Sequence, residues 1–378
     1  MKQRALYFVA GEASGDTHGA ALMSALRALD PQVRFLGRGG PRMQQLAGGR
    51  FLDWSESSSV LGLWEVLKQY RYFRQEFAAA LEQIRTDKPD AVVLIDYPGF
   101  NLRLARALRA QLPGLKIIYY ISPQVWAWNR RRIPKMARYL DLMLCIFPFE
   151  AELYNRSGLR TVFVGHPMIE ALSARRLAGE RDENLVGLFP GSRSREIRKI
   201  LPVMLDAANI LISRKPGTRF EIAAASPALA REIEALAGPS NLPREQFCIT
   251  IGEAAAAMQR AAVGIVASGT ATLEAASFRL PFVLVYRVAW LTYLAARAVV
   301  KVKHLGMPNV LAGREIVPEF IQHRAKPKAI ADSVLQLMDD KDARIRLLSE
   351  LEAIMSKLGG AGASITAAQA ILEEIGSR

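Results

Sequence analysis

Short apolar runs alternate with longer amphipathic stretches along this chain. The runs 91–95 and 117–121 contain only apolar residues, a pattern typical of parallel strands that are buried on both faces. Apolar residues at helical spacing follow the runs, and the alternation begins again at residue 185. The pattern predicts an α/β protein with two Rossmann-like parallel-sheet domains that face a cleft.

A stretch of polar and charged residues predicts the domain boundary. The stretch 175–184 is polar and charged, which predicts a linker. We therefore expect a first domain at 1–174 and a second at 184–327. Residues 328–378 have the pattern of amphipathic helices. Periodicity leaves open whether these helices pack back on the first domain or on a second subunit of a homodimer.

The charge balance indicates a negatively charged partner. The chain has 378 residues, with 50 Lys and Arg against 36 Asp and Glu, and a net charge of +14. The basic residues are spread widely and form no dense arm, which argues against nucleic acid. An anionic lipid surface or a phosphorylated metabolite fits this distribution better.

The numbers and positions of the cysteines and histidines indicate the redox environment of the protein and whether a metal site is expected. Two cysteines in apolar, strand-like contexts indicate a reducing compartment without a disulfide framework. Four scattered histidines and no cysteine cluster predict no metal site by spacing. The one D-x-D match, at 340–342, is expected in a solvated turn between late helices.

Two apolar stretches are candidates for contact with a membrane surface. Residues 59–67 carry a broad apolar face before several basic residues, and this face is either ordinary core or a lipid-facing helix. The segment 283–302 is interrupted by charges, so it is expected to lie on a surface rather than to span a bilayer. The apolar face consists of Val60, Leu61, Leu63, Trp64 and Leu67.

A glycine-rich loop follows the first apolar run. Gly11, Gly15 and Gly19 are spaced four apart, so the loop is neither the dinucleotide fingerprint nor a P-loop. Glycines still permit close approach of a ligand, and amides at a helix start attract anions. The alternative is a strand–helix turn with a helix cap, for which Asp16 is the candidate.

The ends of the next strands carry further polar residues. Asp96 ends a buried strand, where α/β sheets bind ligands, and Asn101 is better placed than Asp96 to cap the following helix. We therefore expect a functional Asp96. The loop 122–128, with two tryptophans, is either a pocket wall or a structural plug. His166 is expected to be a satisfied polar residue rather than an acid or base.

The second half offers two loops suited to a nucleotide. Ser192 and Arg193 lie in a loop that opens a helix, with further arginines nearby, and this arrangement predicts a phosphate site. A small-residue loop at 268–272 also opens a helix. Glu274, one turn into that helix, has the placement to accept hydrogen bonds from both ribose hydroxyls while the loop admits a diphosphate.

An ordered set of motifs resembles the lipid-A-disaccharide synthase family over nearly the whole chain, about residues 5 to 375. The motifs are AGEASGD at 10–16, ID at 95–96 with Pro98 and Asn101, SPQVWAW at 122–128, VGHP at 164–167, LFPGSR at 188–193 and SGTATLE at 268–274.

The resemblance implies a GT-B, inverting, metal-independent glycosyltransferase without a cofactor. It would join UDP-2,3-diacylglucosamine to 2,3-diacylglucosamine 1-phosphate, giving a β-1,6-linked disaccharide 1-phosphate and UDP. The resemblance also implies a cytoplasmic location on the inner face of the inner membrane of Gram-negative bacteria. Other sugar transferases or epimerases with a similar nucleotide half remain the nearest alternatives, followed by a non-enzymatic phosphoanion-binding protein.

Site roles follow from the motifs and the resemblance together. Asp96 is expected to be the catalytic base. The UDP-binding residues are expected to be Ser192, Arg193, Ser268, Gly269, Thr270, Thr272, Glu274 and Asn309. The loop near the sugar and diphosphate is expected to comprise Gly11, Glu12, Ser14, Gly15 and Asp16. The acceptor side is expected to include Asn101, Ser122, Trp126 and His166.

Overall fold

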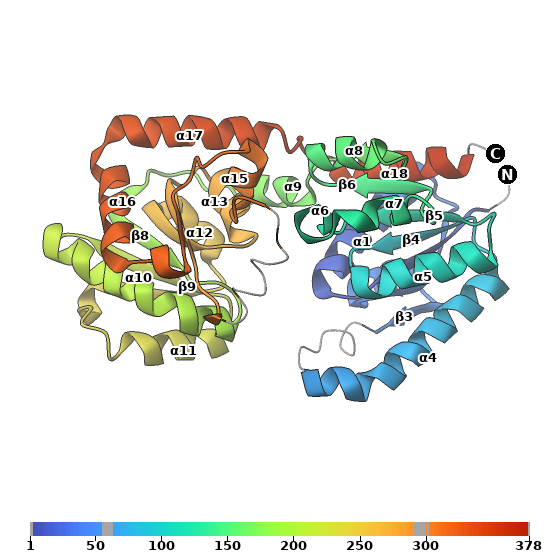
Figure 1. The fold of residues 1–378 in the computed structure, drawn as a ribbon, viewed down its shortest axis with the longest axis horizontal. Helices are drawn as coiled ribbons and strands as arrows, with labels where there is room; N and C mark the ends of the chain where they lie inside the picture. Colours follow the sequence, from blue (N-terminus) through green and yellow to red (C-terminus); the bar gives the residue numbers. More distant parts are fainter. Residues whose placement is uncertain (1–2, 55–62, 291–292, 294–299, 301, 377–378) are drawn as a thin grey trace. The chain divides into compact units, whose positions relative to one another are not determined.

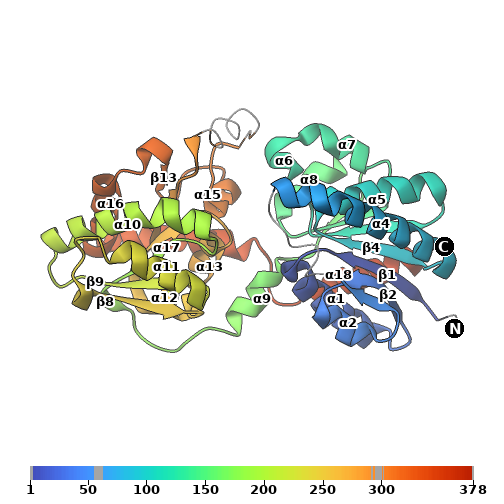
Figure 2. The same cartoon turned by 90° about the horizontal axis from the view of Figure 1, so that it is seen from below.

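The chain forms two compact units, each built around a parallel sheet with helices on both faces (Figures 1 and 2). The computed structural model describes residues 3–54, 63–290, 293, 300 and 302–376, and over 63–71 it describes only the backbone. The first unit comprises Met1–Glu170 and Leu358–Arg378, and the second comprises Ala171–Lys357. The prediction of two parallel-sheet α/β domains is confirmed.

The first sheet reverses its strand order beside β1. In the described part of the first unit, seven parallel strands follow the order β3-β2-β1-β4-β5-β6-β7. The neighbours β1 and β4 therefore form a topological switch point, and ligands of α/β proteins generally bind at the carboxyl edge beside such a point. The strands are β1 (Ala5–Ala10), β2 (Arg34–Gly39), β3 (Phe51–Asp53), β4 (Ala91–Ile95), β5 (Lys116–Tyr120), β6 (Leu142–Cys145) and β7 (Thr161–Phe163).

Helices cover both faces of this sheet because successive strand residues point to opposite sides. In β1, Leu6 and Phe8 join the core that also includes residues of α1, α2 and α18, whereas Tyr7 and Val9 join the core that includes residues of α4 and α5. The helices of this unit are α1 (Ala13–Leu29), α2 (Pro41–Ala47), α4 (Leu63–Asp87), α5 (Pro98–Gln111), α6 (Val125–Trp128), α7 (Ile133–Met136), α8 (Pro148–Asn155), α9 (Pro167–Ser173, which continues into the second unit) and α18 (Ala363–Gly376).

The structure divides the expected C-terminal block 328–378. The helices α16 and α17 belong to the second unit, and only α18 belongs to the first (Figure 1). Ala367 and Ile371 of α18 are fully buried in the core of the first unit, and Glu374 forms ion pairs with Lys116 and Arg160. The amphipathic periodicity correctly indicates helices with one buried face, but it does not indicate which of the two sheets each helix packs against.

The second sheet has a similar reversal. Its described residues form six parallel strands in the order β10-β9-β8-β11-β12-β13, so its switch point lies between β8 and β11. The strands are β8 (Asp182–Phe189), β9 (Arg219–Ala224), β10 (Phe247–Ile251), β11 (Ala261–Ala267), β12 (Phe282–Tyr286) and β13 (Glu319–Ile321). The helices are α10 (Ser194–Arg214), α11 (Pro227–Ala237), α12 (Ala254–Arg260), α13 (Ala271–Ser277), α15 (Met307–Ala312), α16 (Pro327–Asp339) and α17 (Lys341–Ser356).

The polar stretch predicted as a linker is partly structured. Strand β8 already begins at Asp182. Arg181 donates to the carbonyl oxygens of Met258, Ala261 and Phe278, and burial lowers its pKa to about 10. A sequence cannot distinguish a solvated arginine from one that satisfies buried carbonyls, which is why polarity alone indicated a linker here.

The proposed membrane contacts lie largely outside the described residues. Val60 and Leu61 are not described, and neither are the side chains of Leu63, Trp64 and Leu67. The first part of the segment 283–302 is strand β12 rather than a surface helix, and most of the rest is not described. No helix within the described chain has the length and apolar character needed to cross a membrane.

Candidate functional site

The switch point of the first sheet brings three predicted residues together. Ala10 of β1 pairs with Ile95 of β4, so the loops that begin at Gly11 and Asp96 are neighbours. A Cβ atom on Gly11 would lie 2.4 Å from the ring of Tyr97, so glycine is required for this close approach. Glu12 lies close enough to Asp96 to influence its titration. The site therefore contains Gly11, Glu12 and Asp96.

The backbone that carries Asp96 is held in a strained conformation. Asp96 and Tyr97 have φ angles of 45° and 48°, in the left-handed region that non-glycine residues rarely adopt. Asn101 donates from Nδ2 to the carbonyl oxygens of Ile95 and Asp96, at 3.1 and 2.8 Å. The hydroxyl of Tyr119 also donates to the carbonyl of Asp96. Such strain persists where several contacts over-determine it, and it concentrates at functional sites.

The electrostatics of this turn make Asp96 a better proton acceptor than an ordinary aspartate. Burial raises the pKa of Asp96, and the nearby Glu12 carboxylate raises it further. The same two causes, in the same order, raise the pKa of Tyr97 to about 12. A carboxylate with a raised pKa binds a proton more readily near neutral pH, which is what a general base requires.

Asp16 is a helix cap, although of a different helix from the one predicted. Its carboxylate accepts hydrogen bonds from the backbone amides of Arg42 and Met43, at 3.2 and 2.9 Å, in the first turn of α2. A Cβ atom on Gly40 would lie 2.5 Å from the Asp16 carboxyl carbon, so the cap needs a glycine beside it. Asp16 is buried, while Glu12 and Ser14 are exposed and Gly15 is buried. Glu12 and Ser14 are therefore the side chains of this loop that solvent reaches.

The segment 122–128 contains a short helix, α6, which is anchored by a buried hydrogen bond to α8. Trp126 is buried, and its Nε1–H donates to Oε1 of Glu150 at 2.8 Å. The backbone amide of Phe147 donates to the other oxygen of Glu150. Burial raises the pKa of Glu150 to about 7, while contacts from Ser122 and Trp126 oppose the rise. Of the two tryptophans, Trp126 therefore acts as the structural plug.

His166 lies in a buried environment within the first unit. Its ring packs 5.3 Å from that of Phe147, and its Nδ1 accepts from the amide of Met168 at 3.3 Å. Burial lowers the pKa of His166 to about 4, and the proximity of His18 adds to this effect. His166 is consequently neutral near pH 7. These contacts fit a satisfied polar residue.

Two predicted loops meet at the switch point of the second sheet. Phe189 at the end of β8 pairs with Val266 of β11, so the loops containing Ser192 and Ser268 are neighbours. Ser192 and Arg193 are exposed, and α10 begins directly after them, as the sequence predicts. Its first-turn amides supply donors for an anion. Arg193 forms a 3.3 Å ion pair with Glu196.

The loop after β11 is open and small. Gly269 has a φ of 150°, and a Cβ atom there would meet no atom within 4 Å. Thr270 is exposed, whereas Thr272 is fully buried and donates to the carbonyl of Gly269 at 2.8 Å. Ser268 donates to the carbonyl of Leu305 at 3.4 Å. Gly269 and Thr270 are thus the parts of this loop that a ligand reaches most easily.

Glu274 is half-buried one turn into α13. Burial raises its pKa, and the charge of Arg175 opposes that rise. A partly desolvated carboxylate of this kind is suited to accept hydrogen bonds from a diol.

Asn309 supports the second site from within. It is fully buried, and its Nδ2 donates to Oε1 of Glu319 at 2.9 Å. Its Oδ1 accepts from the amides of Ile316 and Val317, while Glu319 accepts from the amide of Gly306. These bonds occupy the amide group of Asn309, so it positions the loops before α15 and β13 rather than pointing at a ligand.

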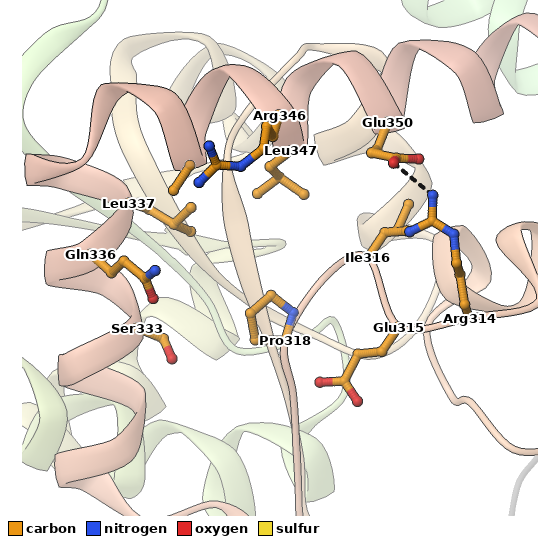
Figure 3. Close-up of a pocket in the computed structure, with 11 residues that line it drawn as sticks. Arg314, Glu315, Ile316, Pro318, Ser333, Gln336, Leu337, Arg346, Leu347 and Glu350 are labelled. Carbon is orange, nitrogen blue, oxygen red and sulfur yellow. Dashed lines mark hydrogen bonds and ion pairs between the residues drawn. The ribbon is translucent and has the colours of Figure 1, made fainter.

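Two surface pockets lie apart from these residues. One of about 300 Å³ lies against α16 and α17, and Arg314 and Glu350 form a 2.6 Å ion pair at its rim (Figure 3). The other, of about 530 Å³, is lined by Tyr7, Arg50 and residues of α4. Neither pocket is lined by a residue predicted for the site.

Metal-ligating side chains do not gather in the described part of the chain. No group of three or more His, Cys, Asp and Glu side chains is arranged there to hold an ion. In the D-x-D sequence, Asp340 accepts a 2.9 Å hydrogen bond from the amide of Ala343 and so caps α17.

Comparison with known proteins agrees with the motif set. The profile of the lipid-A-disaccharide synthetase family matches residues 6–370. The lipid-A-disaccharide synthase of Trichlorobacter lovleyi is 37% identical to this chain over 387 residues, which cover 99% of this chain and 98% of the relative. The lipid-A-disaccharide synthase of Pseudomonas paraeruginosa is 38% identical over 379 residues, which cover 98% of each chain. This chain belongs to the lipid-A-disaccharide synthase family. It is therefore a glycosyltransferase-family protein of lipid A biosynthesis.

Solved structures share the fold of this synthase-family chain at low sequence identity. The UDP-N-acetylglucosamine 2-epimerase of Neisseria meningitidis bound to UDP-GlcNAc has a TM-score of 0.61 at 13% identity, covering 98% of this chain and 100% of that one. A calicheamicin glycosyltransferase has a TM-score of 0.61 at 16% identity, covering 100% and 99%. These likenesses show the GT-B fold.

Sequence reasoning missed several residues that shape the site. Tyr97 carries half of the strained turn, and Tyr119 and Glu150 anchor neighbouring segments. The sequence gives a signal only for Tyr97, which lies between Asp96 and Pro98 at the end of a buried run. Glu150 and Tyr119 are ordinary members of a helix and a strand, and only the folded chain shows what they contact.

Proposed function

We propose that this chain joins UDP-2,3-diacylglucosamine to 2,3-diacylglucosamine 1-phosphate, forming a β-1,6-linked lipid A disaccharide 1-phosphate and UDP. Family membership across 6–370 supports this choice of reaction. The observation that carries the mechanism is the strained turn at the first switch point, which presents Asp96 beside Glu12 with a raised pKa. A carboxylate held in this way is suited to deprotonate an acceptor hydroxyl.

The proposed transfer is a single in-line displacement. Asp96 takes the proton of the acceptor 6-hydroxyl while that oxygen forms a bond to the anomeric carbon of the donor. The bond between this carbon and the UDP oxygen breaks on the opposite face, which inverts the configuration. The departing diphosphate gains negative charge, and Arg193 with the first-turn amides of α10 would stabilise it electrostatically.

The second unit is the proposed nucleotide site. Ser192, Arg193, Gly269 and Thr270 are exposed around its switch point and would contact the diphosphate, while Glu274 would bind the ribose. Ser268, Thr272 and Asn309 would act mainly by holding the loops, since their side chains already have internal partners.

The first unit is the proposed acceptor site. Gly11, Glu12 and Ser14 would border the reacting sugar. Asn101, Ser122, Trp126 and His166 would shape that side from buried positions. We also propose that the protein works at the cytoplasmic face of the inner membrane without a metal ion, and that exhaustive EDTA treatment leaves turnover intact. Loss of activity that Mg²⁺ restores would contradict the metal-free mechanism.

A UDP-release assay tests the proposed function. The purified protein is incubated with UDP-2,3-diacylglucosamine, with and without 2,3-diacylglucosamine 1-phosphate, in neutral detergent micelles. We expect UDP and a disaccharide 1-phosphate only when both substrates are present. UDP release without the acceptor, or epimerised donor without disaccharide, would assign a different reaction.

A further inference from the structure

One stretch of the first unit carries positive charge without any acidic residue. Residues 97–140 contain nine Lys and Arg and no Asp or Glu. Two of the nine pair with carboxylates from outside the stretch, Arg109 with Asp141 and Lys116 with Glu374. The other seven form no ion pair with any described residue: Arg103, Arg106, Arg130, Arg131, Arg132, Lys135 and Arg138. Such an uncompensated set is suited to an anionic partner.

Four consecutive or near-consecutive residues form what we call the Trp–Arg cluster: Trp128, Arg130, Arg131 and Arg132. The guanidinium carbon of Arg132 lies 4.8 Å from the ring centroid of Trp128, and Trp128 is 39% exposed. Arg130 uses only Nε in a 3.0 Å hydrogen bond to the carbonyl of Trp126. The terminal nitrogens of Arg130 have no hydrogen bond to a described residue, so they can bind a ligand.

Two arginines at the start of α10 in the second unit differ from the cluster. Arg193 already has a carboxylate partner in Glu196, and Arg198 has one in Glu232. The Trp–Arg cluster has no such partner in the described chain. An anion that binds there displaces water only, whereas an anion at Arg193 competes with a carboxylate.

The backbone beneath the cluster is held by buried contacts. Trp126 is fixed by Glu150, as described above, and the hydroxyl of Tyr154 donates to the carbonyl of Pro123 at 2.9 Å. On the other side, Ile133 and Met136 of α7 are buried in the core. Ordering the backbone in advance lowers the entropy that arginines lose when they bind a ligand.

The segment that leads to the cluster begins at the same carboxyl edge of the sheet as Asp96. Strand β5, which leads into α6, pairs with β4 so that Tyr120 is opposite Ile95. Adjacent strands are about 4.8 Å apart, so the segment after β5 starts one strand away from Asp96. Both views of the ribbon place α6 beside α7 and close to α5 (Figures 1 and 2).

We propose that the Trp–Arg cluster binds the phosphate monoester of the acceptor. This inference rests on the proposed function, in which the acceptor carries its phosphate on C1 and the reacting hydroxyl on C6, so that the two groups lie on either side of the ring oxygen. Guanidinium groups bind phosphate through paired N–H donors. The cluster thus orients the hydroxyl toward Asp96 and favours phosphorylated acceptors.

Kinetics with paired acceptors test this assignment. The acceptors are 2,3-diacylglucosamine 1-phosphate and the same sugar without phosphate, both in neutral detergent micelles. The variants are Arg131→Gln and the triple variant Arg130→Gln/Arg131→Gln/Arg132→Gln. We expect both to raise the KM of the phosphorylated acceptor, and the triple variant to raise it about tenfold or more. The KM of the donor and the kinetics with the unphosphorylated acceptor should stay unchanged.

Arg138→Gln is the matched control, since it removes one exposed positive charge from the same basic stretch outside the cluster. The single variant Arg131→Gln guards against misfolding, because the Arg131 side chain makes no hydrogen bond or ion pair with the described residues. Equal losses for both acceptors would overturn the proposal. A loss seen only when anionic lipid is added to the micelles would instead assign the cluster to the bilayer surface.

A binding measurement separates this inference from the proposed function. Calorimetry compares the binding of 2,3-diacylglucosamine 1-phosphate with that of the same sugar without phosphate. The wild-type protein should bind the phosphorylated sugar more tightly, and the triple variant should bind the two sugars equally. This result would stand even if no disaccharide formed, in which case only the proposed function would fail. Phosphate-dependent binding that survives in the triple variant would overturn the inference.

Discussion

Asp96 has the surroundings of a proton acceptor. It is half-buried, it lies beside the Glu12 carboxylate, and its pKa is raised by both circumstances. Asn101 and Tyr119 hold the carbonyl of the same residue, so the side chain leaves a left-handed turn in a defined direction. The backbone position of Asp96 is thus set by Asn101 and Tyr119, whereas its pKa is set by burial and by Glu12. The two properties can be altered by separate substitutions.

Asp96→Asn removes the proposed proton acceptor with little change in shape. We expect turnover to fall by ~10²–10⁴-fold, the usual contribution of a general base, with unchanged folding by circular dichroism. Single-turnover UDP release measures the effect. Near-normal turnover would show that another group, with Glu12 next in line, takes the proton.

Glu12→Gln should move the acid limb of the pH profile of kcat/KM. The negative charge of Glu12 raises the pKa of Asp96, and Asp96 can act as the proposed base only when it is deprotonated. Removing that charge lowers the pKa of Asp96, so activity persists to lower pH. Glu82→Gln, an exposed change on α4, is the control. An unmoved limb would mean that Glu12 and the catalytic base do not interact.

At the scale of elements, buried polar side chains decide how the site segments are held. Glu150 of α8 fixes α6 through Trp126, Asp16 of α1 caps α2, and Asn309 ties α15 to the segment before β13. Each contact joins residues from different elements. In each case a buried acceptor meets the N–H groups that would otherwise be unsatisfied.

Glu150→Gln tests the anchor of α6 through the pH dependence of stability. The pKa of Glu150 is raised from an ordinary 4.5 to about 7, so between these values the unfolded chain releases a proton that the folded protein keeps. Stability from this group is therefore lost as the pH rises through that window. The variant cannot ionise there, so its stability relative to wild type should increase by up to about 3 kcal/mol between pH 4.5 and 7.

Thermal unfolding measured from pH 4.5 to 8 gives the comparison. Other titrating groups are common to both proteins, so the difference isolates Glu150. Glu152→Gln, on the same helix but exposed, should show no such dependence. A constant difference across the range would mean that Glu150 ionises in the folded protein as it does in water.

At the scale of the whole molecule, the chain builds two cores and shares its C-terminal helices between them. Ile371 of α18 is fully buried in the first unit, and Ile330 of α16 is fully buried in the second. The two positions are chemically alike and only 41 residues apart. They therefore form a matched pair for measuring how independent the two cores are.

Ile371→Ala and Ile330→Ala should each destabilise one unit. Truncation of a buried isoleucine costs about 2–5 kcal/mol. Hydrogen exchange measured by mass spectrometry should show lost protection in β1, β4 and β5 for the first variant, and in β8 and β11 for the second. Equal loss throughout both sheets in either variant would mean that the chain unfolds as a single cooperative unit.

The sequence by itself determined the two α/β halves and the positions of the main site loops. Continuous apolar runs identify buried strands, and polar or small residues directly after them, such as Asp96, Ser192 and Gly269, must lie at the carboxyl edges of the sheets. This inference needs only the local order of residues, which is why strand ends were predicted well.

Only the tertiary structure decided which strands became neighbours and which polar side chains were already occupied. Strand order placed Glu12 beside Asp96, and long-range contacts turned Asp16, Trp126 and Asn309 inward. The same contacts placed α18 with the first sheet and α16 with the second. The physical reason is that hydrogen-bond partners and buried apolar faces are chosen across the fold, over sequence separations that local patterns do not encode.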